Sequence, residues 1–101
     1  MAKIAFEKIE ELYKLHEKRN EYARQGMDAM ISYGVESKEA DEAYNKAKEV
    51  DEEIEYQALM LKKDIGLVYG LQLVRIIDAI YPLSISRVLK CLEVCGFEVV
   101  L

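Results

Sequence analysis

The feature that most constrains the fold of this chain is a stripe of mainly apolar residues that recurs every three or four positions. The stripe consists of Ala40, Ala43, Ala47, Val50, Ile54, Gln57 and Leu61. Alternating steps of three and four residues keep one narrow face of an α-helix apolar, as in the seam of a coiled coil. The pattern predicts a helix over residues 38–63 that must bury this face against a second helix.

The second helix is predicted from the residues that precede the stripe. Apolar residues and His16 recur at helical spacing over residues 4–33. Gly34 supplies the permissive backbone on which helices often end, and Ser37 is a typical N-cap for the helix that follows. Folding the chain back at this turn places the two apolar faces against each other. We therefore expect a long antiparallel, coiled-coil-like helical hairpin over residues 1–63, with arms of roughly 40 Å at ~1.5 Å per residue.

Two shorter helices are predicted in the last third of the chain, where apolar residues become denser. One covers about residues 67–81 and is ended by Pro82, which cannot continue a helix. The other covers residues 85–95, with Ser84 as its N-cap and Leu83 at the position of a hydrophobic staple. We expect both helices to pack at the base of the hairpin.

The resulting prediction is an all-α fold that forms a single domain over residues 1–101. Residues 64–101 form its hydrophobic helical base and end in a short apolar tail. The sequence leaves open whether the second and third helices continue through Gly66, because a glycine costs a helix interior about 1 kcal/mol without forbidding it.

Composition limits the function classes. The formal net charge is −5, from 14 basic and 19 acidic residues, which weighs against a general nucleic-acid binder. The most apolar stretch, residues 65–81, contains Gln72, Arg75 and Asp78, so no membrane span is expected. Two cysteines four positions apart are not the disulfide framework of a secreted protein. We therefore expect a cytoplasmic protein, of a cell or of an infected host.

The residues with chemical potential each have a simpler interpretation. Cys91 and Cys95 share a helix face and could hold zinc only if two chains pooled their thiols, so small buried hydrophobes are the favoured role. His16 lies on the inner stripe of the first helix, one turn from Asn20, where it could form a buried polar pair or be a pH-sensitive position. The favoured interpretation is a half-exposed residue that fills a gap opposite Val50 and Ile54. Neither arrangement predicts a catalytic site.

A run of acidic residues on the predicted second helix could coordinate a metal ion or imitate a phosphate backbone. The run is Glu49, Asp51, Glu52, Glu53 and Glu55. Val50 and Ile54 interrupt it at core spacing, which favours a solvated helix face. Nucleophile, phosphate-loop and dinucleotide motifs are missing from the sequence. We therefore expect no catalytic, cofactor-binding or metal-binding residues, and a non-enzymatic protein.

The predicted third helix is apolar on most of its circumference, which is more surface than the rest of the chain can cover. The interaction residues expected on this helix are Leu67, Leu71, Val74, Ile77 and Tyr81, and those expected in the tail are Phe97, Val99 and Leu101. The tail is expected to extend and to pair with a symmetry-related copy. Two alternatives remain: the four helices close into a compact bundle, or the tail folds back into its own core.

These features predict a protein–protein interaction module, homo-oligomeric and with a protein partner, acting as an adaptor, an assembly factor or a small inhibitor. The analogy is with small acidic helical proteins of phages and mobile elements. The alternative function is a nucleic-acid-associated regulator with a local basic patch. That patch would comprise Lys62, Lys63, Arg75, Arg87 and Lys90.

Overall fold

A computed structural model describes residues 2–80 and 84–101 of the chain. The elements follow the order β1 (Ala2–Ala5), α1 (Phe6–Tyr33), α2 (Lys38–Ile65), α3 (Leu67–Ile80), α4 (Ile85–Val94) and β2 (Phe97–Val100). The mostly helical fold predicted from the sequence is confirmed. The predicted helix end at Pro82 and the staple residue Leu83 lie outside the described residues, as does Tyr81.

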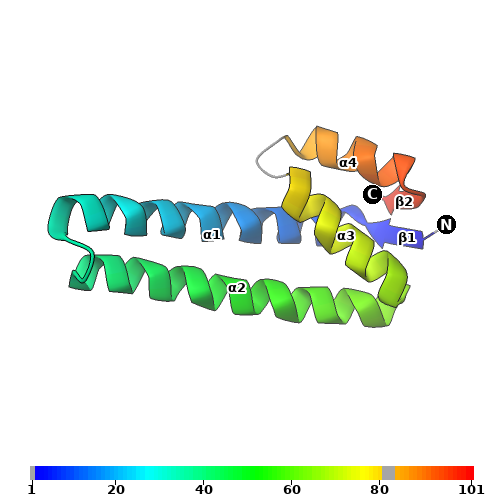
Figure 1. The fold of residues 1–101 in the computed structure, drawn as a ribbon. Coiled ribbons are helices and arrows are strands. Elements are labelled where there is room, and N and C mark those ends of the chain that lie inside the picture. The colour runs from blue at the N-terminus through cyan, green and yellow to red at the C-terminus, as the bar shows by residue number, and fades with distance from the viewer. Residues whose placement is uncertain (1, 81–83) are drawn as a thin grey trace.

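The two long helices, α1 and α2, lie side by side and are joined by a short turn at one end of the molecule, which measures 49 × 25 × 19 Å (Figure 1). The buried residues of α2 are Ala40, Ala43, Ala47, Val50, Ile54, Ala58 and Leu61. This is the predicted stripe, except that Ala58 is buried where Gln57 was expected. At the turn, Gly34 has a φ of 108° and Ser37 Oγ accepts a hydrogen bond of 3.2 Å from the backbone N–H of Ala40. The local signals for the turn are therefore confirmed.

The second and third helices are separate. Helix α2 ends at Ile65, and Gly66 has a φ of 93°, which lets the chain change direction before α3 begins. Four residues later, Gly70 packs against α2 so closely that an added Cβ would lie 2.9 Å from Cα of Lys62. The contact between the two helices therefore depends on a glycine at this position.

The N-terminus departs from the prediction of a helix that begins at residue 4. Residues 2–5 form β1, which pairs in parallel with β2, and the register places Ala2 opposite Phe97 and Ile4 opposite Val99. Ala2 and Ile4 are buried, whereas Lys3 and Ala5 are exposed, which is the two-residue alternation of a strand. The fold is therefore not purely helical. The strand partner of the tail is the N-terminus of its own chain, as in the alternative in which the tail folds back into its own core.

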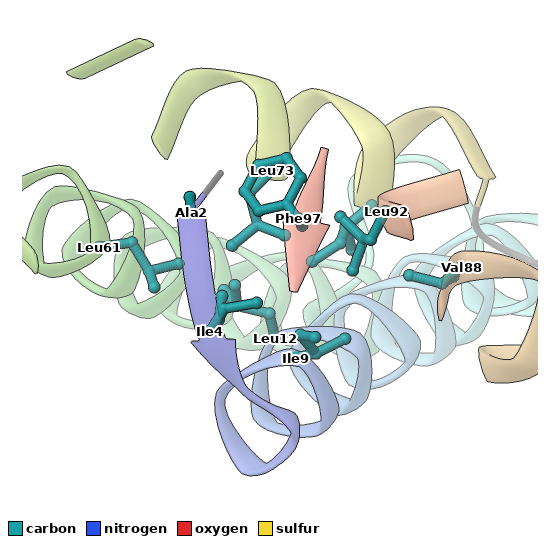
Figure 2. Close-up of a cluster of buried hydrophobic side chains, with 10 residues drawn as sticks. Ala2, Ile4, Ile9, Leu12, Leu61, Leu73, Val88, Leu92 and Phe97 are labelled. Atoms are coloured by element: carbon teal, nitrogen blue, oxygen red, sulfur yellow. The ribbon is translucent and has the colours of Figure 1, made fainter. Parts of the chain in front are cut away.

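All six elements contribute to one hydrophobic core around this small sheet (Figure 2). Its buried members are Ala2, Ile4, Ile9, Leu12, Leu61, Leu73, Ile77, Val88, Leu92 and Phe97. The ring of Phe97 meets that of Tyr69 edge to face, with 5.5 Å between centroids. The core thus lies at the end of the molecule that holds the two strands, and the α1–α2 pair extends away from it.

Replacement of Gly70 by alanine should destabilise the protein more than the same change at Gly26. Both glycines lie inside helices and gain helix propensity as alanine. At Gly70 the new methyl group meets backbone that cannot move aside, so we expect a loss of about 1–3 kcal/mol. At Gly26 its nearest neighbours are atoms of the ring of Tyr44, a side chain that is 38% exposed and can move aside more easily than backbone. Urea unfolding of both variants measures the difference, and equal midpoints would contradict the close approach of α3 to α2.

Truncation of Phe97 should lower the free energy of unfolding by most of the amount that the tail contributes. Phe97→Ala removes a ring that is 2% exposed and should cost roughly 3–5 kcal/mol. Leu101→Ala removes a fully exposed side chain from the same tail and should change stability by less than about 0.5 kcal/mol. Guanidinium unfolding followed by circular dichroism gives both values. Similar, small effects would mean that β2 is not part of the core.

Candidate functional site

Helix α3 has one face in the core and another that no described residue covers. On the inward face, Leu73 and Ile77 are completely buried between the sheet and the surrounding helices. On the outward side, Leu67 is 62% exposed and Leu71 is 37% exposed. Val74 is half-buried and lies three residues beyond Leu71, so these three side chains follow one side of the helix at i, i+4 and i+7. We call Leu67, Leu71 and Val74 the α3 stripe.

The structure divides the expected interaction residues into three groups. The α3 stripe and Leu101 are accessible, and Val99 is half-buried against the core. Ile77 and Phe97 lie inside the core, so neither belongs to a surface of the folded chain. The sequence does not predict the β1–β2 pair. Without that pair the two side chains have no cover within their own chain, so they are expected at an interface. Tyr81 lies outside the described residues.

A second group of exposed apolar side chains lies at the turn between α1 and α2, at the far end from the strands (Figure 1). Met27, Ile31, Tyr33 and Val35 are each more than half exposed, and we call them the apolar tip. The neighbouring acidic residues, Asp28, Glu36, Glu39, Asp41 and Glu42, are exposed as well. The signal was present in the sequence, because the stripe on α2 begins with small alanines that cannot cover four large side chains.

The one buried polar side chain among the described residues is His16, which is 1% exposed. Its Nδ1 lies 3.1 Å from Oδ1 of Asp78 on α3, which the sequence had not suggested as its partner. Burial lowers the pKa of His16 below its ordinary value of 6.5, the negative charge of Asp78 acts to raise that pKa, and Arg19 and Asp51 exert smaller opposing effects. His16 therefore lies at a contact between α1 and α3, through its short distance to Asp78.

One residue of the acidic run on α2, Asp51, forms an ion pair with the neighbouring helix. Asp51 accepts a hydrogen bond of 3.2 Å from Nη1 of Arg19, which links α2 to α1. The remaining carboxylates of the run are exposed. Within residues 2–80 and 84–101, no three His, Cys, Asp or Glu side chains gather in a geometry that could hold a metal ion. The run therefore fits the interpretation of a solvated helix face.

The five cations of the alternative basic patch are distributed over three helices. Lys62 and Lys63 end α2, Arg75 lies on α3, and Arg87 and Lys90 lie on α4. Lys62 is half-buried beside Gly70, whereas the other four are exposed. No observation in this arrangement favours a nucleic-acid interface over an ordinary solvated surface.

Comparison with known proteins gave no match to a family model, a curated protein or a solved structure. In the part of the chain that the structure describes, no helix has the length and hydrophobicity required to span a membrane. The surfaces of the molecule itself are therefore the available guide to its function.

The stability that His16 contributes should depend on pH. Since its pKa is lower in the folded than in the unfolded chain, the unfolded state binds more protons as pH falls below 6.5. The contribution is therefore fully present above pH 6.5 and is lost as pH falls through the lowered pKa. We expect the difference in the free energy of unfolding between the wild type and His16→Gln to decrease as pH falls below 6.5.

The Asp78→Asn variant provides the control for this measurement. Asp78 acts to raise the pKa of His16, so its replacement by asparagine should lower that pKa further. The loss of stability between pH 6.5 and the lowered pKa should therefore be larger in Asp78→Asn than in the wild type. Denaturant unfolding at several pH values measures all three proteins. A constant difference between the wild type and His16→Gln would show that His16 has the same pKa in both states.

Proposed function

We propose that this chain is a non-enzymatic protein–protein interaction module that forms a homo-oligomer through its base and acts as an adaptor, an assembly factor or a small inhibitor of another protein. The observation that carries the proposal is the exposure of the α3 stripe. Leu67 and Leu71 remain accessible although the opposite face of the same helix is completely buried. Exposed apolar surface of this kind is typical of interaction sites.

The geometry of the stripe suits a second helix as its neighbour. Side chains at i, i+4 and i+7 form a ridge that packs into the groove of a facing helix. Burying a leucine side chain contributes about 1.5–3 kcal/mol before the cost of association is subtracted. A two-fold axis beside α3 would bring the same stripe of a second copy into contact, so that one patch serves both subunits.

The α1–α2 pair is proposed to be the part that reaches a partner, as an antiparallel coiled-coil arm. It extends away from the core and ends in the apolar tip, with Ile31 83% exposed. The acidic residues around the tip would favour a partner whose contact surface is apolar with a basic rim. Oligomerisation at the base would then present two or more such tips in one particle.

Charge placed on the α3 stripe should dissociate the oligomer. We expect the wild type to be larger than a monomer at micromolar concentration, and Leu67→Lys/Leu71→Lys to be monomeric, because an unpaired charge is costly to bury in an interface. Both leucines are exposed, so the helical circular dichroism spectrum should not change. Gel filtration with light scattering measures the mass of each protein.

The matched control is Val68→Lys/Gln72→Lys, which adds two lysines at the same spacing on another side of α3. Both residues are exposed and lie outside the stripe. This variant should keep the mass of the wild type. A monomeric wild type would overturn the proposed oligomer, and dissociation of the control alone would place the contact on a different side of α3.

A further inference from the structure

The two cysteines lie one helical turn apart near the end of α4. Both are free thiols, Cys91 half-buried and Cys95 exposed. The exposure of Cys95 does not fit the expectation that both cysteines are buried hydrophobes. The backbone N–H of Cys95 donates a hydrogen bond of 3.0 Å to the carbonyl of Cys91, which fixes the helical spacing between the two residues. With Lys90 and Val94 they line a shallow surface hollow of about 200 Å³.

This spacing is too long for a disulfide within the helix but suits a bridging ion. Residues four apart on a helix have Cβ atoms about 5–6 Å apart, whereas a disulfide requires about 3.5–4.5 Å. Closing that bond would distort the last turn of α4. Two thiolates bound to one metal ion by bonds of roughly 2.3 Å can have their sulfurs up to about 4.6 Å apart. An ion between the two sulfurs therefore tolerates a wider separation of the two side chains than a direct sulfur–sulfur bond does.

We propose that Cys91 and Cys95 bind one cuprous ion as a two-coordinate bis-thiolate site. Thiolates are soft ligands and favour Cu(I), whose filled d shell accepts linear coordination by two sulfurs. A structural zinc ion takes four ligands, and the described part of the chain groups no third His, Cys, Asp or Glu with this pair.

Binding forms two copper–sulfur bonds and releases the two thiol protons to solvent, with no change in the oxidation state of copper. The resulting centre carries one negative charge, and the aliphatic part of the Lys90 side chain lines the same hollow. The hollow is open to solvent, since Val94 is 88% exposed, so the ion can enter and leave without unfolding of the helix.

Competition for Cu(I) tests the proposal on the full-length reduced protein. Under anaerobic conditions, the protein is titrated with Cu(I) in the presence of the colorimetric chelator bicinchoninate. We expect one ion per chain, a thiolate-to-copper charge-transfer band in the ultraviolet, and two sulfur neighbours of copper in X-ray absorption. Cys95→Ser should weaken binding by at least about a hundredfold, because one arm of the chelate is lost. Cys95 is exposed, so this variant should keep its helical spectrum.

A spacing control separates a chelate from two unrelated thiols. The double variant Cys95→Ser/Glu93→Cys keeps two cysteines per chain but places them two residues apart, on different sides of the helix. It should bind Cu(I) as weakly as Cys95→Ser alone. Wild-type affinity in this control, or one ion per two chains with four sulfur neighbours, would overturn the proposal. Rapid formation of an intramolecular disulfide with no loss of helix would overturn the spacing on which it rests.

Discussion

The pairing of the two chain ends is the contact on which the rest of the structure depends. β1 and β2 are each four residues long, and a lone pair of such strands is marginal in water. The pair is stabilised because one of its faces, formed by Ala2, Ile4, Phe97 and Val99, packs against the helices. The helices share this core with the sheet, since Leu73 and Leu92 belong to the same buried cluster as Phe97 (Figure 2). The sheet and the helical base therefore stabilise each other.

This arrangement also determines which apolar surface stays accessible. The sheet and α4 cover the inward face of α3, Gly70 brings the helix tightly against α2, and His16 reaches it from α1 through Asp78. The apolar residues of α3 that stay exposed are Leu67, Val68 and Leu71, with Val74 half-buried beside them. The apolar tip has a different origin, because the turn that joins α1 to α2 has no neighbouring element to cover it. The molecule thus has two separate apolar surfaces, one at the base and one at the end of the arm.

Two of the polar contacts between described side chains link different helices. The Arg19–Asp51 pair joins the two long helices, and His16–Asp78 joins α1 to α3. The buried imidazole of His16 thus meets a carboxylate of α3 whose side chain is half exposed to solvent. The thiol pair on α4 lies outside this network, so metal binding there would leave the packing of the base unchanged.

The sequence by itself determined the helices, the turn at Gly34 and the buried stripe of α2, because periodicity, capping residues and glycine conformation act within a few residues of one another. It also indicated that α3 carries more apolar surface than one face requires. It could not determine that Ile77 and Phe97 turn inward while Leu67 and Leu71 face solvent. That division depends on a strand pair between residues at opposite ends of the chain, and segments of four residues carry too little pattern to predict it. The pairing of residues 2–5 with residues 97–100 is visible only in the tertiary structure. It forms because burial of the shared face of the sheet offsets the entropy cost of bringing the two segments together.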